Sequence, residues 1–270
     1  MVMRRVFNHH VCLCVLSTAI LAGLALMTSQ TKVYAAQNCN GLASGNGNSQ
    51  NDSQSGPIVC DETADGTGVK NGVGTLTGNR TIDMNEHSSE AAVTITGPKA
   101  KIRISSELKV TNSRGSNNNP AIKVHNKGVL KLVGGVNVTG VQKGIDVSGS
   151  GSSVTVMTGS IGVRAQGGGS LIEVKNSGKV VLIKGVTVTG SGSGEEVVIN
   201  NGGTVELNKV QLKDVTTGIV VKGGGNANVK GGATITVKDG GTGFKMEGTG
   251  TADVVDMTIM GRGERGRGLR

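Results

Sequence analysis

Five aspartates are the residues of this chain best suited to acid–base or metal chemistry: Asp146, Asp214, Asp239, Asp253 and Asp256. Enzymes that cleave polysaccharides need clustered carboxylates, often with calcium, together with a basic residue. Asp214 and Asp239 end the similar tripeptides Leu-Lys-Asp and Val-Lys-Asp in successive repeats, so they could stack on one face about one repeat apart. A turn residue that recurs with the repeat explains the same spacing, and we favour that interpretation.

The other motifs do not assemble into a known kind of site. His87 and His125 lie far apart and have no serine and acid partners in a catalytic pattern. Gly167-Gly-Gly and Gly223-Gly-Gly lack the helix that must follow a phosphate-binding glycine loop. We therefore predict that the chain is not an enzyme and binds no metal and no cofactor. A polysaccharide lyase or hydrolase is the rival hypothesis.

A repeat of about two dozen residues, which is the size typical of stacked repeat proteins, organises the chain from Lys101 to Met260. Its clearest copy begins Val129-Leu-Lys-Leu-Val-Gly-Gly-Val-Asn-Val, and later copies begin near Val180 and Thr204. Each copy consists of short runs in which valine, isoleucine and threonine alternate with other residues, as in β-strands. Glycine and asparagine stand between the runs, where the chain must turn sharply.

A β-solenoid follows from this pattern, because one repeat cannot bury its own apolar residues whereas stacked repeats bury a continuous row. We predict an all-β chain that forms a right-handed parallel β-helix of about six coils, with about three strands in each coil. Aromatic residues make up only 1% of the chain, which suits a narrow core. The side chains predicted to point inward are Val138, Ile145, Val188 and Ile219. The basic residues interpreted as solvated outward positions are Lys101, Arg103, Lys109, Lys123, Lys131 and Lys184.

Residues 1–35 have the features of a secretory signal peptide. Two arginines near the start precede an uncharged apolar run from Val11 to Met27, and Val33-Tyr-Ala supplies a small residue at the cleavage position. We predict cleavage between Ala35 and Ala36, which requires the export machinery and leaves no membrane span. The alternative is an uncleaved membrane anchor, for which the apolar run is at the short limit.

Residues 36–75 are polar and poorly patterned, and we predict that they form a flexible segment before a β-helix over residues 76–260. Cys39 and Cys60 are the only cysteines left after cleavage. In an exported protein such a pair is expected to form a disulfide, with free thiols as the alternative. Closing a loop of this size stabilises the fold by about 3 kcal/mol in the chain-entropy model.

The last ten residues, 261–270, are rich in arginine and glycine and break the repeat, so we predict a disordered tail. A truncated or frame-shifted reading frame explains it, and an arm that binds nucleic acid or anionic surfaces is the alternative. The formal net charge is +9, but the leader and the tail hold most of it. The remaining body is only mildly basic, so we predict no nucleic-acid partner.

The leader, the polar cysteine-containing segment and the Val-x-Val coils with Gly and Asn corners together resemble the passenger domain of Gram-negative autotransporters. That resemblance covers roughly residues 1–260 and implies a pectin-lyase-like right-handed β-helix. It further implies export, display on the outer membrane or release as a secreted protein, and adhesion to host cell-surface or matrix molecules in virulence.

The sequence departs from this family in one respect, because the C-terminal translocator barrel, with its aromatic-rich strands, has no counterpart in it. Retention in the periplasm, or a non-functional remnant of a longer autotransporter, is therefore an alternative to an adhesin on the cell surface.

Overall fold

A computed structural model of the chain describes residues 39, 56–65, 68–87, 89–115, 117–163, 170–190, 194–261 and 267–269. These residues form strands and turns and contain no helix, which confirms the all-β class. Accordingly, no helix in this part of the chain is long and apolar enough to cross a membrane. The signal peptide predicted over residues 1–35, with cleavage between Ala35 and Ala36, lies outside the described residues.

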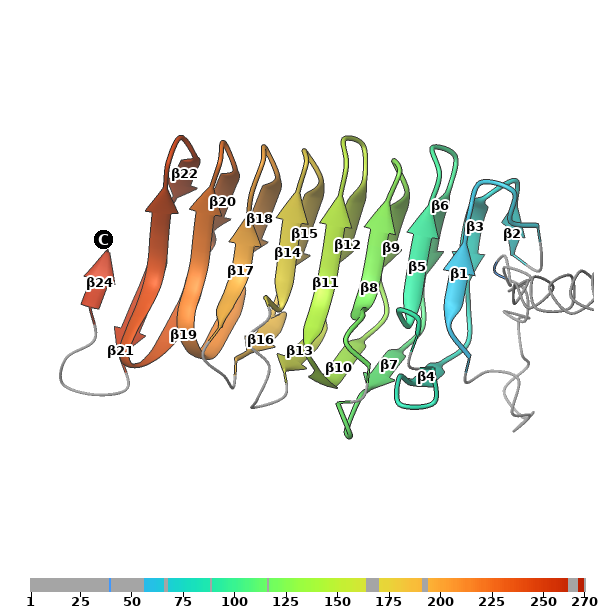
Figure 1. Ribbon diagram of the computed structural model, residues 1–270, viewed down its shortest axis with the longest axis horizontal. Coiled ribbons are helices and arrows are strands. Elements are labelled where there is room, and N and C mark those ends of the chain that lie inside the picture. The colour runs from blue at the N-terminus through green and yellow to red at the C-terminus, as the bar shows by residue number, and fades with distance from the viewer. Residues whose placement is uncertain are drawn as a thin grey trace, which may run out of the picture. The chain divides into compact units, whose positions relative to one another are not determined.

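Three faces of parallel strands wind around one axis, and each coil contributes a strand or a half-strand to each face (Figure 1). Face 1 consists of β3 (Val73–Leu76), β6 (Lys101–Ile104), β9 (Val129–Leu132), β12 (Ser153–Val156), β15 (Lys179–Ile183), β18 (Thr204–Asn208), β20 (Asn226–Lys230) and β22 (Thr251–Val254). A two-residue strand, β2 (Val69–Lys70), pairs antiparallel with β3 at its start.

Face 2 consists of β4 (Arg80–Asp83), β7 (Leu108–Thr111), β10 (Val136–Val141), β13 (Gly159–Val163), β16 (Thr187–Thr189), the first halves of β19 (Gln211–Lys222) and β21 (Ala233–Glu247), and β23 (Met257–Gly261). Face 3 consists of β1 (Ile58–Cys60), β5 (Val93–Thr96), β8 (Pro120–His125), β11 (Lys143–Ser148), β14 (Ile172–Lys175), β17 (Glu195–Ile199) and the second halves of β19 and β21. These two long strands pass from face 2 to face 3 without a break, and they join the two faces into one hydrogen-bonded sheet.

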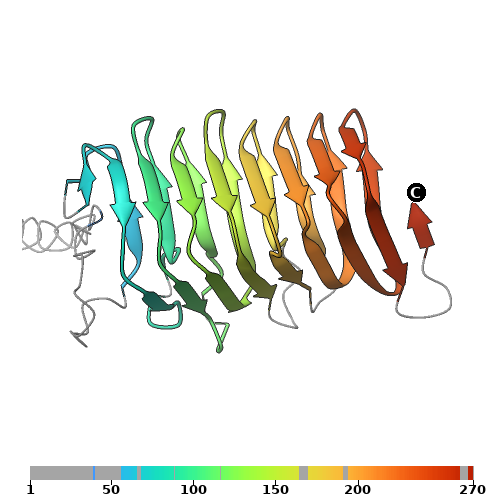
Figure 2. The same ribbon diagram turned by 180° about the vertical axis from the view of Figure 1, so that it is seen from behind.

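The solenoid has about seven turns, one more than the sequence predicted. It starts earlier than expected, because β1, β2 and most of β3 fall within the segment predicted to be flexible over residues 36–75. The short run Ile58–Cys60 pairs in parallel with Val93–Ile95 of β5, so even three residues are ordered by the edge of the next coil. In Figure 1 the nearest strands run upward while the coils advance from right to left, and Figure 2 shows the opposite side with downward strands. The superhelix is therefore right-handed, as predicted.

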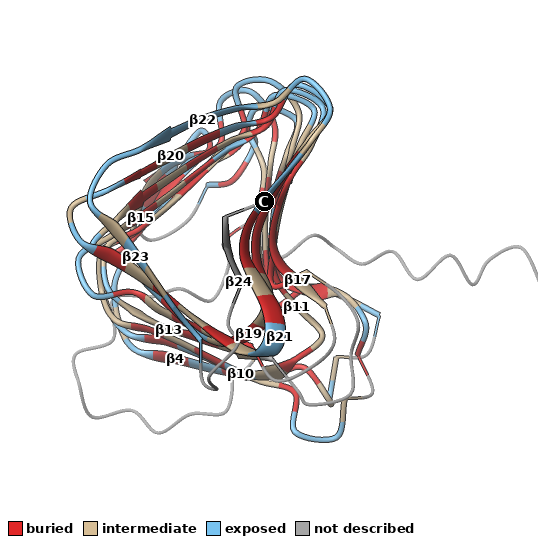
Figure 3. Cartoon of the chain, turned by 90° about the vertical axis from the view of Figure 1, so that its left-hand side faces the viewer, coloured by how far each residue is buried: buried red, intermediate tan, exposed pale blue. Residues whose placement is uncertain are grey.

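The core is a set of apolar columns that run along the axis, one residue from each coil. One column on face 3 contains Ile122, Ile145, Ile172, Val197, Ile219 and Phe244, each paired in register with the next. The four side chains predicted to point inward, Val138, Ile145, Val188 and Ile219, are at most 1% exposed, which confirms the prediction. The end-on view in Figure 3 shows this buried lining on all three faces. Burial of continuous columns is what makes each coil depend on its neighbours.

The corners are formed by residues in the left-handed region of φ. Asn126, Asn176 and Asn201 have φ values of 53°, 52° and 46°, and they occupy corners between face 3 and face 1. Asparagine tolerates this conformation better than other residues with a side chain. The side chain of Asn201 also donates a hydrogen bond of 3.4 Å to Oδ1 of Asn176 in the preceding coil. The asparagines therefore both turn the chain and connect successive coils.

The tail is not wholly irregular. Residues Arg267–Leu269 form β24, which pairs in parallel with Thr242 and Phe244 of β21, whereas the sequence predicted a disordered tail over residues 261–270. The second half of β21 has no further coil beside it in the described residues, so its backbone groups are open to pairing. Pairing depends on backbone groups more than on side chains, which is why an Arg/Gly segment can supply this strand.

Candidate interaction surface

The five candidate aspartates are dispersed over the solenoid. Asp146 points outward from β11 and lies 3.4 Å from Nζ of Lys175, so it is part of an ion pair. Asp214 lies in the register shift of β19 between Leu212 and Val215. Asp239 lies in the extra residues of β21 between Val237 and Thr242, which have no paired partners in β19.

The suggested stack of Asp214 and Asp239 is therefore wrong, because β19 and β21 have different lengths between their paired segments. Asp253 lies on β22 opposite Asn228, and Asp256 has a φ of 59° in the turn that follows β22. Among the described residues no group of three or more His, Cys, Asp or Glu side chains is placed to hold a metal ion.

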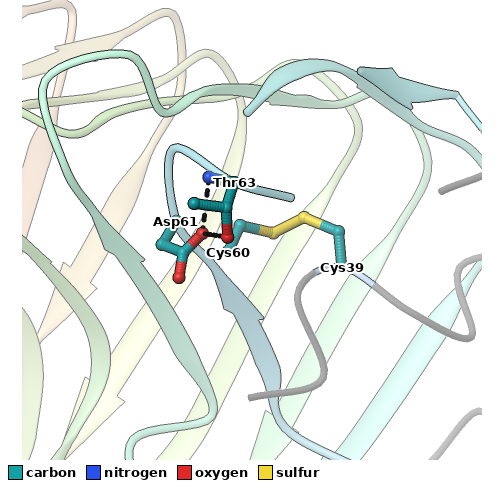
Figure 4. Close-up of a disulfide and its surroundings, with 4 residues drawn as sticks. All are labelled: Cys39, Cys60, Asp61 and Thr63. Atoms are coloured by element: carbon teal, nitrogen blue, oxygen red, sulfur yellow. Dashed lines mark hydrogen bonds between the residues drawn. A yellow bond between two sulfur atoms is a disulfide. The ribbon is translucent and has the colours of Figure 1, made fainter. Parts of the chain in front are cut away.

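Cys39 and Cys60 form a disulfide, as predicted (Figure 4). Cys60 ends β1 and is fully buried, and the backbone N–H of Cys39 donates a 2.8 Å hydrogen bond to the carbonyl oxygen of Val59. Immediately after β1, Oδ1 of Asp61 accepts hydrogen bonds of 2.7 Å from both the backbone N–H and the hydroxyl of Thr63. The disulfide therefore fastens the preceding chain to the first strand of face 3.

Ion pairs cover the outside of the later coils. On face 3, Lys175 bridges Asp146 and Glu173, and Lys222 bridges Glu195 and Glu247. The hydrogen bonds that the Lys222 ammonium donates to Glu195 raise its pKa above the usual lysine value. The other pairs are Lys143–Glu173, Lys179–Glu206 and Lys245–Glu247. Acidic and basic residues thus neutralise one another from one coil to the next over this part of the surface.

The second coil and the start of the third have a different charge pattern. Between residues 97 and 131 the chain has eight lysines and arginines but a single acidic residue, Glu107. All eight cations are exposed, and none takes part in an ion pair with a described residue. The eight are Lys99, Lys101, Arg103, Lys109, Arg114, Lys123, Lys127 and Lys131. The whole-chain charge concealed this local excess, because acidic residues precede it in the first coil.

Five of these cations lie together on face 1 and on its corner with face 3, and we call them the basic patch. Its members are Lys99, Lys101, Arg103, Lys127 and Lys131. Lys101 and Arg103 are alternate residues of β6, and Arg103 is paired in register with Lys131 of β9. Lys99 and Lys127 stand in the corners that lead into these two strands. The sequence prediction that Lys101, Arg103 and Lys131 face solvent is confirmed.

One buried carboxyl group was missed by the sequence analysis. Glu196 of β17 is 1% exposed, and its Oε1 has no hydrogen-bond partner among the described residues. Burial raises the pKa of Glu196 to about 7, although the charge of Lys238 and a hydrogen bond from the backbone of Thr216 oppose the shift. A Cβ on Gly190 would overlap Oε1 of Glu196, so the carboxyl group lies directly against this glycine. Glu195-Glu196 looks like an ordinary exposed pair in the sequence, which is why no signal identified it.

The comparisons with known proteins add no family to this description. The chain matches no protein-family model. Neither the curated proteins nor the solved structures gave a significant match.

Proposed function

We propose that the chain is an exported, non-enzymatic protein that acts through its outer surface, in the manner of an autotransporter passenger. The observation that carries the proposal is the solenoid itself, in which apolar columns fill the interior and the long outer faces are polar. Such a solenoid offers long continuous outer faces, and solenoid repeat proteins bind partners through extended surfaces. Its partners on this proposal are host cell-surface or matrix molecules.

Two further observations support export. The Cys39–Cys60 disulfide is typical of proteins that fold in an oxidising compartment. The leader over residues 1–35 has the charge and hydrophobic pattern of a signal peptide. On this proposal the mature chain begins at Ala36 and is displayed, released or retained outside the inner membrane.

Cell fractionation tests the proposal directly. The full chain is expressed with its leader in a Gram-negative host, and the N-terminus of the product is read by mass spectrometry. We expect the mature chain, beginning at Ala36, in the periplasmic, surface or medium fraction, and protease added to intact cells distinguishes display from retention. Full-length, reduced protein in the cytoplasm would refute the export proposal.

The rival function, cleavage of an acidic polysaccharide, has its own assay. Purified protein is incubated with acidic polysaccharides and calcium, and unsaturated products are followed by their ultraviolet absorbance. We expect none. Release of such products, together with its loss in Asp146→Asn, would overturn the non-enzymatic part of the proposal.

A further inference from the structure

We infer that the basic patch is a binding site for a linear sulfated polysaccharide. This inference deepens the proposed surface role and rests on it, because such polymers lie outside the cell. The patch was defined above as Lys99, Lys101, Arg103, Lys127 and Lys131.

The positive charges form a compact two-dimensional array. Lys101 and Arg103 leave β6 on the same side, about 7 Å apart along the strand, since alternate residues share a face. Arg103 and Lys131 are register partners on neighbouring strands, which lie about 4.8 Å apart. A Cβ on Gly151 would lie 3.3 Å from Cγ of Lys127, so the stem of this lysine is packed against the next corner. The array therefore presents several cations to one side of the rod.

The patch retains a repulsion that no ion pair with a described residue relieves, whereas Lys175 bridges the like-charged register partners Asp146 and Glu173. Like charges on directly opposite residues of neighbouring strands are destabilising, and Arg103 and Lys131 are such a pair. On the same face, Lys179 is instead neutralised by Glu206 at 2.7 Å. Several anionic groups bound at once would relieve the repulsion in the patch. A polymer with closely spaced sulfates supplies them on one molecule.

The neighbours of the patch favour a sugar polymer over other polyanions. The register partners that flank the patch on face 1 are Thr75, opposite Arg103 in the preceding coil, and Thr155, opposite Lys131 in the following one. Ser153 is two residues before Thr155 on the same strand, and these half-buried hydroxyls can bond to sugar hydroxyls. Proteins that bind single-stranded nucleic acid stack bases on aromatic side chains, and among residues 39–261 with a described side chain Phe244 is the only aromatic and is 3% exposed. A membrane-binding surface needs an apolar face beside its cations, and among the described residues of these coils Val73 is the only exposed large hydrophobic residue.

Binding to immobilised heparin tests the inference with the folded mature chain. We expect binding at physiological salt that weakens steeply as salt rises, because cations that contact the polymer release its counterions. The double variant Arg103→Glu/Lys131→Glu should bind at least tenfold more weakly. A matched control, Lys213→Glu/Lys230→Glu, changes the net charge equally at exposed positions outside the patch, and it should stay within about twofold of the wild type.

A second patch variant keeps the test valid if Arg103→Glu/Lys131→Glu does not fold. Lys99→Ala/Lys127→Ala alters only corner side chains, and it should also reduce heparin binding severalfold while leaving the circular dichroism spectrum unchanged. The inference is refuted by an exported wild-type chain that fails to bind heparin, by equal losses in the patch and control variants, or by duplex DNA that competes as strongly as heparin. The first of these outcomes leaves the proposed export intact, whereas cytoplasmic retention refutes the proposed function regardless of heparin binding.

Discussion

Glu196 makes the stability of the solenoid depend on pH. Its carboxyl group is buried in the folded chain, where its pKa rises from 4.5 to about 7. Below pH 4.5 it is protonated in both the folded and the unfolded chain and contributes no pH dependence. Between pH 4.5 and pH 7 the unfolded chain releases the proton while the folded chain keeps it, so the free energy of unfolding falls as the pH rises.

The size of this loss follows from the shift. Each pKa unit corresponds to 1.36 kcal/mol, so the ionised carboxylate costs the folded state on the order of 3 kcal/mol above pH 7. The substitution Glu196→Gln removes the ionisation and keeps the shape of the side chain. The variant should therefore match the wild type at pH 4 and exceed its stability at pH 8 by up to about 3 kcal/mol.

Urea unfolding at pH 4 and at pH 8 measures the difference, with the midpoint and the slope compared between variants. Glu107→Gln is the matched control, because Glu107 is exposed and its loss should change stability by no more than about 0.5 kcal/mol at either pH. An equal effect of Glu196→Gln at both pH values, or a wild type that is more stable than the variant at pH 8, would refute this reasoning.

Four further variants test the packing, the disulfide, a close approach at a glycine and the surface ion pairs. Ile145→Ala empties part of a fully stacked column and should lower the free energy of unfolding by about 2–5 kcal/mol in urea titrations. Replacing Cys39 and Cys60 by serine should cost about 3 kcal/mol, and reduction of the wild type with dithiothreitol should lower its melting temperature to that of the variant. Gly218→Ala should cost about 1–3 kcal/mol, because a Cβ there would overlap the carbonyl oxygen of Gly243 and lie 2.9 Å from Cγ2 of Ile235. Lys222→Ala should cost less than about 1 kcal/mol and only at low salt, since its ion pairs are partly exposed.

Each of these results has a contrasting outcome, and for the disulfide it is a melting temperature that reduction leaves unchanged. Gly135→Ala is the control for Gly218→Ala, because the atom nearest to a Cβ added at Gly135 is Cγ of Glu107, 3.9 Å away. Equal destabilisation in the two variants would contradict the close approach at Gly218. A neutral effect of Ile145→Ala would contradict the stacked column. If Lys222→Ala lowered the free energy of unfolding by several kcal/mol, its ion pairs would contribute more than exposed surface pairs do.

The sequence by itself determined the architecture, because strand alternation and corner chemistry are local properties. Val138 and Val188 are buried because each alternates with polar neighbours on its strand, and Asn176 turns the chain because its side chain tolerates positive φ. The pairing of Cys39 with Cys60 needed only the count of cysteines and the predicted leader. The inward-facing side of a strand, the residue that turns the chain and the available cysteine partner can each be predicted without knowing how one coil is aligned with the next.

The tertiary structure decided the features that depend on how successive coils are aligned. The repeats differ in length, so β19 and β21 run through a corner that other coils turn with a loop, and Asp214 and Asp239 fall out of register. The structure also decides that Glu196 is buried against Gly190, and that Arg103 lies opposite Lys131 whereas Lys179 forms an ion pair with Glu206 of the next coil. Burial and charge pairing in a solenoid depend on which residues of adjacent coils are opposite each other, and no single repeat contains that information.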